Sequence, residues 1–249
     1  MSLGEHRVFF LSEDDFYRDN EAKINPSDSH HICHVLRLKI GDYVVVVTNQ
    51  GKYKARLIED NNDECCVCLE DCLQIVQAPK IKIHLLQSLP KLKKMDEIIE
   101  KSTELGVYAI HPFLSQRSSV NSSVDLQSKE DRWKRIALAA SKQSRRFSVP
   151  AIYPVQKLES MISNSSWPEE TIKIIFWEQE EQKRLLHLFP LVSNLQEIVI
   201  CIGPEGGFTV AEVSMMIEAG FQTFSLGNQI LRTETAGPFA VGFIINLSE

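Results

Sequence analysis

The chain has 249 residues, of which 43% are hydrophobic, and a formal net charge of −6. This composition is typical of a globular protein with one large or two ordinary domains, and the net charge argues against a protein that coats nucleic acid with its whole surface. No run approaches eighteen consecutive apolar residues, and the first residues lack the pattern of a signal peptide. We therefore expect a cytoplasmic protein that does not enter a membrane.

The charges are distributed unevenly along the chain. Residues 1–79 have a net charge of −6, residues 80–146 of +7 and residues 147–249 of −7. The basic middle segment indicates either a surface that contacts phosphates or helices with solvated charged faces. Charge alone does not separate these two interpretations.

Residues 1–77 show the alternating polarity of β-strands. The segments YVVVVT at 43–48 and KYKARLIE at 52–59 are separated by Asn49-Gln50-Gly51, a sequence that predicts a hairpin turn. We expect these residues to form a small β-barrel or sandwich. Beyond them, strand patterns give way to alternating strands and helices, which predicts a second domain at 78–249.

Six cysteines occur without a secretory context, so thiols are expected rather than disulfides. They are Cys33, Cys65, Cys66, Cys68, Cys72 and Cys201. CCVC at 65–68 and HHICH at 30–34 suggest a metal site, but CCVC lacks a paired C-x2-C spacing. Alternation along a strand also directs Cys65 to the face opposite Cys66 and Cys68. We expect no metal ion and assign the cluster no role.

Beyond residue 80, short apolar runs alternate with amphipathic segments. This pattern predicts parallel strands joined by helices, that is, an α/β domain. The predicted strands are IKIHLLQ at 81–87, VYAIHPFL at 107–114, KIIFW at 173–177, EIVICI at 197–202 and FQTFSL at 221–226, and the predicted helices include 90–106, which Gly106 ends, and 127–146.

The strand EIVICI is followed by the turn GPEGG at 203–207. Thr209 and Glu212 have the spacing of a capping box, so the next helix is expected to begin near Val210. The glycine turn therefore lies at the carboxyl end of a parallel strand, which is where ligands bind in open α/β sheets.

The chemistry of this turn does not suit a phosphate. It has neither the lysine of a GxxxxGK[ST] loop nor the spacing of GxGxxG, and Glu205 would repel an anion. A neutral or positively charged group fits better, for instance a ribose whose hydroxyls donate to a carboxylate, or a sulfonium.

A second turn follows the next predicted strand. Gly227-Asn228 comes first, then the apolar pair Ile230-Leu231, and then Arg232. A helix is expected to open near Thr235, because Pro238 is tolerated in the first turn of a helix. Two such turns at successive strand ends indicate a shared pocket more strongly than they indicate two ordinary helix caps.

The motifs GPEGGFT at 203–209 and LGNQILRTETA at 226–236 strongly resemble the SPOUT superfamily of S-adenosylmethionine-dependent RNA methyltransferases. More closely, the chain resembles the RsmE family, which methylates N3 of a uridine in 16S ribosomal RNA. KSTELGV at 101–107 is similar to a family motif, as are, in approximate form, the segments 31–37 and 132–150. The resemblance covers nearly the whole chain, and its C-terminal motifs are the most specific.

The resemblance implies a PUA-like β-barrel, followed by an α/β domain with a trefoil knot at its C-terminus. It also implies a homodimer, S-adenosyl-L-methionine as the methyl donor, and 16S rRNA or the small ribosomal subunit as the partner. By motif matching, the donor-binding residues are Glu178, Gly203, Pro204, Glu205, Gly206, Gly207, Leu226, Gly227, Ile230, Leu231 and Arg232.

Methylation of uracil N3 requires loss of the N3 proton and stabilisation of the negative charge that spreads to O2 and O4. Within the resemblance, Arg232 is the predicted cation and Glu234 the predicted proton acceptor. Two simpler roles stay open, namely an ion pair between Arg232 and Glu234 and a helix cap formed by Glu234.

The N3 atom lies on the base-pairing edge, so the target base must be unpaired or flipped out. The barrel and the basic segment are expected to hold the surrounding RNA. The candidate phosphate contacts are Arg37, Lys91, Lys93, Arg132, Arg145 and Arg146. Two other functions stay open: a SPOUT enzyme that methylates ribose 2′-OH with the same donor pocket, and a catalytically silent RNA-binding protein of ribosome assembly.

Overall fold

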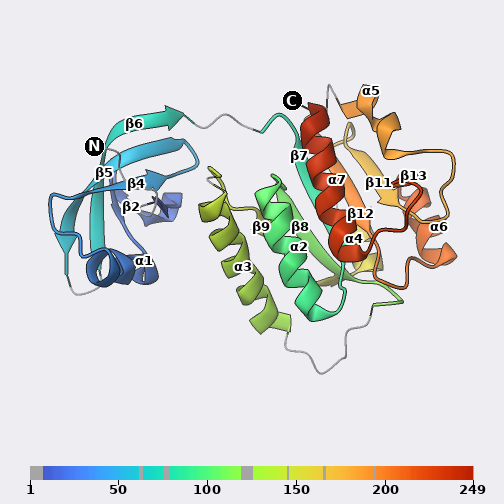
Figure 1. Ribbon diagram of the computed structural model, residues 1–249, viewed down its shortest axis with the longest axis horizontal. Coiled ribbons are helices and arrows are strands. Elements are labelled where there is room, and N and C mark those ends of the chain that lie inside the picture. The colour runs from blue at the N-terminus through green and yellow to red at the C-terminus, as the bar shows by residue number, and fades with distance from the viewer. Residues whose placement is uncertain are drawn as a thin grey trace. The chain divides into compact units, whose positions relative to one another are not determined.

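The structure is a computed structural model in which the chain forms two compact units (Figure 1). The β unit consists of residues 1–78 and 145–148, and the α/β unit consists of residues 79–144 and 149–249. The boundary predicted after residue 77 falls outside the described part of the chain. The described residues are 8–61, 64–75, 79–118, 126–144, 146–164, 167–192 and 195–248.

The β unit is built on a six-stranded sheet with the order β1-β4-β5-β6-β3-β2. Neighbouring strands are antiparallel except for β1 and β4, which are parallel. The strands are β1 (Val8–Phe10), β2 (Phe16–Arg18), β3 (Glu21–Lys23), β4 (Tyr43–Val47), β5 (Gly51–Asp60) and β6 (Cys65–Ile75).

The predicted hairpin between β4 and β5 is confirmed. The backbone N–H groups of Gln50 and Gly51 donate to the hydroxyl of Thr48 at 3.1 and 3.2 Å, which satisfies the donors of the tight turn. Apolar residues of both strands, among them Val44 and Leu57, are fully buried in the core of the unit.

The connection between β3 and β4 is helical, which the sequence patterns did not predict. The side chain of Asn25 accepts the backbone N–H of Asp28 at 3.0 Å and caps α1 (Pro26–His30). The chain then continues as one π-helical segment, η2 (His31–Val35), and a 3-10 turn, η1 (Glu13–Asp15), precedes β2. Ile32 of η2 is fully buried, so packing against the sheet stabilises this segment.

The α/β unit contains a parallel sheet with the order β10-β8-β7-β12-β11-β13, and β9 pairs with β8. The five strands predicted from apolar runs are confirmed. The strands are β7 (Lys82–Ser88), β8 (Ala109–Leu114), β9 (Ala151–Ile152), β10 (Gln156–Lys157), β11 (Ile172–Phe176), β12 (Glu197–Ile202) and β13 (Gln222–Phe224).

Helices cover both faces of this sheet, and Figure 1 shows α2, α3 and α7 together on one of them. α4 and α6 pack on the other face. The helices are α2 (Leu92–Glu104), α3 (Leu126–Gln143), α4 (Leu158–Asn164), α5 (Phe189–Val192), α6 (Val210–Glu218) and α7 (Thr233–Ser248), with a 3-10 turn, η3 (Leu185–Leu188), before α5. Within the described residues, we find no helix with the length and apolar character needed to cross a bilayer.

Strand β12 shows why its sequence is apolar throughout. Ile198 and Ile200 pack in the core shared with α2, α3 and α7, whereas Val199 and Cys201 pack in the core shared with α4 and α6. All four are buried, as expected for a parallel strand with helices on both faces. Because β12 lies between β7 and β11, and β13 lies beyond β11, the carboxyl ends of three strands meet at one edge.

The predicted start of the last helix near Thr235 is wrong. α7 begins at Thr233, because the carbonyl of Arg232 already accepts the backbone N–H groups of Thr235 and Ala236, both at 2.8 Å. Pro238 therefore lies in the second turn, where its missing N–H leaves the carbonyl of Glu234 without its usual helical donor.

Candidate functional site

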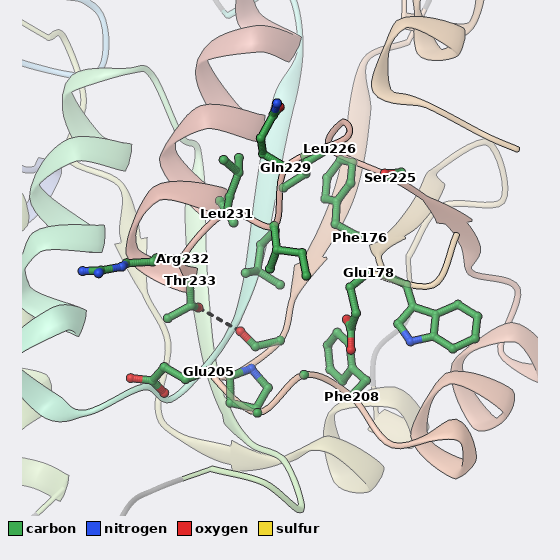
Figure 2. A pocket seen from close by; sticks show the side chains of 18 of the residues that line it. Phe176, Glu178, Glu205, Phe208, Ser225, Leu226, Gln229, Leu231, Arg232 and Thr233 are labelled. Atoms are coloured by element: carbon green, nitrogen blue, oxygen red, sulfur yellow. Dashed lines mark hydrogen bonds between the residues drawn. The ribbon is translucent and has the colours of Figure 1, made fainter. Parts of the chain in front are cut away.

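The carboxyl ends of β11, β12 and β13 border a pocket of about 560 Å³ (Figure 2). Its wall consists of residues 176–178, 202–208 and 225–233, together with Lys94 of α2 and Ala236 of α7. Every residue that the resemblance assigns to the methyl donor lies in this wall. The two glycine turns are separated in the sequence by a helix and a strand, α6 and β13, but they line one cavity.

The first turn has little room for side chains. Gly207 has a φ of +67°, and a Cβ atom there would overlap the carboxylate of Glu178. A Cβ atom on Gly203 would lie 3.1 Å from the ring of Phe208. The backbone N–H of Gly207 donates to the carbonyl of Pro204 at 3.0 Å and closes the turn. The glycines are therefore required by this conformation and by neighbouring side chains.

The capping box predicted after this turn is confirmed, and α6 begins at Val210. The hydroxyl of Thr209 accepts the backbone N–H of Glu212 at 3.2 Å, and the carboxylate of Glu212 accepts that of Thr209 at 2.8 Å. The same carboxylate, on a side chain that is 2% exposed, accepts the backbone N–H of Gln116 at 2.8 Å. Glu212 thus also holds the loop after β8 against the start of α6.

Thr233 connects the two turns (Figure 2). Its hydroxyl donates to the carbonyl of Gly203 at 2.8 Å and accepts from Nε2 of Gln87 at 3.0 Å. This contact holds the first residue of α7 against the end of β12. Sequence reasoning missed Thr233 and Gln87, because neither local pattern indicates a hydrogen bond to a residue so far along the chain.

Lys94 is the charged residue of the pocket that sequence reasoning missed. Its Nζ lies 3.2 Å from Oε1 of Glu205 and 3.1 Å from Oε2 of Glu234, so one lysine pairs with a carboxylate from each turn. The backbone N–H of Lys91 also donates to Oε1 of Glu205, at 3.3 Å. No local pattern signals this pairing, because Lys94 lies more than a hundred residues before Glu205 in the chain.

These contacts shift the pKa values of all three side chains. The hydrogen bond to Glu234, together with that to Glu205, raises the pKa of the Lys94 ammonium. Burial raises the pKa of the Glu234 carboxyl, but its own backbone N–H, Lys94 and Arg232 outweigh burial and hold it below 4.5. At Glu205, burial also raises the pKa of the carboxyl, but the backbone N–H groups and Lys94 outweigh burial and lower it. Both carboxylates are therefore ionised at neutral pH.

Arg232 lies at the rim of the pocket and is exposed. Figure 2 shows its side chain extending away from Glu178 and Phe208. The sequence left open an ion pair between Arg232 and Glu234. Among the described residues, Glu234 pairs instead with Lys94. Glu234 is the second residue of α7, where a carboxylate also interacts favourably with the positive end of the helix.

Three of the predicted RNA contacts belong to the α/β unit. Lys91 and Lys93 are exposed at the start of α2. Arg132 of α3 pairs with Asp96 of α2, with Nη2 2.8 Å from Oδ2, so part of its charge is neutralised within the protein. The two lysines are thus the freer cations for a phosphate.

The other three belong to the β unit. Arg37 is exposed and has a φ of +53°, in the left-handed region that side chains other than glycine seldom adopt. Arg146 is half-buried, and burial lowers the pKa of its guanidinium to about 10. Arg145 lies outside the described residues.

The comparisons with known proteins agree with this geometry. A model of the RNA methyltransferase domain matches residues 77–245, and a model of the RNA methyltransferase PUA domain matches residues 24–68. Ribosomal RNA small subunit methyltransferase E of Bacillus subtilis (strain 168) is 33% identical over 227 residues, which cover 89% of this chain and 88% of that protein. The chain belongs to the ribosomal RNA small subunit methyltransferase E family.

Further members of this family of RNA methyltransferases are similar over most of their length. The enzyme of Mesomycoplasma hyopneumoniae (strain 232) is 32% identical over 93% of this chain and 95% of that protein. The crystal structure of ribosomal RNA small subunit methyltransferase E from Neisseria gonorrhoeae bound to S-adenosyl methionine is 28% identical, with a TM-score of 0.79 over 97% of this chain and 98% of that one. The expected PUA-like and α/β architecture of the family is confirmed.

Proposed function

We propose that this protein transfers a methyl group from S-adenosyl-L-methionine to N3 of a uridine in 16S ribosomal RNA. The observation that carries the proposal is the single pocket formed by two glycine turns, with carboxylates and apolar side chains in its wall. The gonococcal relative bound to S-adenosyl methionine supports the same donor here.

The residues of the pocket fit this donor in size and chemistry. A volume of about 560 Å³ lies within the range of roughly 300–1,000 Å³ found for sites of small molecules and cofactors. Leu226 and Leu231 would supply apolar contacts to an adenine ring, while Glu178 and Glu205 would accept hydrogen bonds from ribose hydroxyls or balance a positive charge. The donor, when bound, supplies a methyl group activated by the sulfonium charge.

We assign Glu234 as the acceptor of the N3 proton and Arg232 as the cation that stabilises the developing charge on O2 and O4. The lowered pKa of Glu234 makes it a weak base, so alignment of the reacting atoms contributes more to the rate than proton transfer does. Lys94 has a supporting role, since it neutralises two carboxylates that would otherwise repel an anionic base.

We further propose that Lys91 and Lys93 hold phosphates of the RNA around an unpaired or flipped-out uridine, with Arg37, Arg132, Arg145 and Arg146 as weaker candidates. Lys91 adjoins the pocket, because its backbone N–H donates to Glu205. Lys93→Glu should weaken RNA binding and lower the slope of log K against log salt by about one per lost contact. The exposed Glu100→Lys, later in the same helix, serves as the control. A slope that is unchanged in Lys93→Glu contradicts this role.

We also propose two domains, a PUA-like RNA-binding domain at 1–77 and a methyltransferase domain at 78–249. The same proposal includes a cytoplasmic location, a C-terminal trefoil knot and a homodimer. The strand order β12-β11-β13 supports the knot, because the chain crosses β11 between β12 and β13 before α7 returns towards β7 and β12. Ile230, which is 86% exposed beside the pocket, and Phe239, which is 42% exposed on α7, support a second copy that covers them.

The decisive experiment maps the product on small ribosomal subunits that lack the modification. Subunits treated with the protein and S-adenosyl-L-methionine should stop reverse transcriptase at one uridine, because an N3-methyl group blocks base pairing. Readthrough with a methyl group on ribose would favour the 2′-O enzyme. Failure to bind the donor in calorimetry would favour the catalytically silent RNA-binding protein.

A further inference from the structure

We propose that Cys33, Asp60 and Cys65 of the β unit form a binding site for a soft or borderline divalent cation such as Zn²⁺. This site is separate from methyl transfer. The sequence argued against a metal because CCVC lacks a paired C-x2-C spacing and its cysteines alternate between the two faces of a strand. The fold, however, brings one cysteine from each segment together.

The three side chains come from three different elements. Cys33 lies in η2, Asp60 ends β5 and Cys65 begins β6. The Sγ of Cys33 lies 3.1 Å from the Sγ of Cys65 and 3.2 Å from Oδ1 of Asp60, and all three ligand atoms lie within 4.8 Å of one another. Tetrahedral zinc with Zn–S bonds of about 2.3 Å places two sulfurs about 3.8 Å apart, so the thiols need to separate by only about 0.7 Å.

The donor set and its burial suit such an ion. Two thiolates and a carboxylate are ligands that zinc accepts, and three protein ligands leave one position for water. Cys65 is 1% exposed, Cys33 is half-buried and Asp60 is exposed. The cluster is therefore anchored on its inner side and open to solvent on its outer side, which provides a route for the ion.

The surroundings hold the ligands in place. The backbone N–H of Cys65 donates to the hydroxyl of Ser29 at 3.1 Å, and that hydroxyl donates to the carbonyl of Ile24 at 3.0 Å. Outer contacts of this kind orient metal ligands. Zinc binds deprotonated thiolates, so an ion bound here would displace the thiol protons.

The test uses the reduced, metal-free full-length protein with Cd²⁺ as a spectroscopic probe and Zn²⁺ as its competitor. We expect one thiolate-to-cadmium charge-transfer band that saturates at one ion per chain and is abolished by Zn²⁺. Cys33→Ser and Asp60→Asn should each weaken binding by roughly tenfold or more, since loss of outer contacts alone costs that much in other sites. Cys72→Ser, at an exposed cysteine of the same strand, should bind as the unaltered protein does.

Alkylation with mass spectrometry adds a readout at single residues. Zn²⁺ should protect Cys33 but leave Cys72 reactive. Because Cys65 is buried and its substitution risks unfolding the sheet, Cys33→Ser and Asp60→Asn carry the test, with circular dichroism as the check of folding. Absence of a saturable band, or equal affinity in Cys33→Ser, Asp60→Asn and the unaltered protein, overturns the proposal.

Discussion

Lys94 sets the charge balance of the pocket, because it lies within ion-pair distance of carboxylates from both turns. Without it, no ammonium would lie between the carboxylates of Glu205 and Glu234. Their lowered pKa values depend in part on this one side chain, although backbone N–H groups also contribute. The pH dependence of the site is therefore a property of Lys94 as much as of the two glutamates.

Lys94→Met should raise the pKa of both carboxyls, since each loses an attractive positive charge. A group with a raised pKa becomes protonated at a higher pH, so the acidic limb of the kcat/KM profile should move to higher pH. Lys94→Arg keeps the charge and should leave that limb near its original position. Carboxyl titration by NMR checks the same shift without turnover, and a profile and titration unaltered in Lys94→Met would disprove this role.

Gly207 combines a left-handed backbone with close contact to Glu178. In Gly207→Ala the new methyl group would displace the Glu178 carboxylate, while the protein still folds because that side chain can move. Loss of one charged hydrogen bond costs about 1.5–3 kcal/mol, so donor affinity in calorimetry should fall roughly tenfold to a hundredfold.

Gly41→Ala is the matched control for Gly207→Ala. Gly41 lies in the β unit and also has a positive φ, of +96°. A Cβ atom on Gly41, however, would meet nothing within 4 Å. Its substitution should lower stability by about 1 kcal/mol through backbone strain and leave donor affinity unchanged. Equal donor affinity in both variants would remove Glu178 from the proposed donor site.

At the level of elements, Glu212 contributes more than a helix cap. Thr209→Ala removes one capping acceptor and should lower the free energy of unfolding by about 1 kcal/mol. Glu212→Ala leaves the backbone N–H groups of both Thr209 and Gln116 without their acceptor and should cost about 2–3 kcal/mol. Urea unfolding measures both, and the exposed Glu218→Ala of the same helix should change little. Equal costs for the first two would show that the link to Gln116 adds no stability.

Local sequence patterns predicted the helices and strands that are determined by neighbouring residues in the chain. The capping box gave the start of α6, and a run buried on both faces gave β12. The start of α7 was placed two residues late, because Pro238 was expected in the first turn of the helix and lies in the second. The helical segment η2 was missed, since burial of Ile32 against the sheet stabilises it.

For the whole molecule, periodicity predicted an α/β domain but not the order of its strands. That β12 inserts between β7 and β11 is decided by packing across the entire sheet, which no local pattern indicates. The same holds for the pocket. Its glycine turns were recognisable as motifs, whereas Lys94 approaches them from a helix more than a hundred residues earlier in the chain.

The stability of the α/β unit should depend on a buried pair of histidines that plays no part in the proposed chemistry. Nδ1 of His84 lies 3.1 Å from Nε2 of His111, and the ring of Trp167 packs against both. Lys82 and Glu197 are the charged neighbours of His84, with Glu197 Oε1 3.2 Å from its Nε2. Burial, with Lys82, lowers the pKa of His84 to about 4, and burial, with His84, lowers that of His111 to about 3.

Since these folded-state pKa values lie below the unfolded value of 6.5, the unfolded chain binds more protons as the pH falls. The stability that these neutral histidines contribute to folding is complete above pH 6.5 and is lost progressively as the pH falls towards 4. For His84, whose side chain is 8% exposed, the loss is on the order of 3 kcal/mol. Urea unfolding across this range should give a steep loss of stability that the double variant His84→Gln/His111→Gln flattens, whatever its stability at neutral pH. His34→Gln, exposed in the β unit, should keep the original slope, and an equally steep slope in the double variant would mean that these histidines are not held neutral by burial.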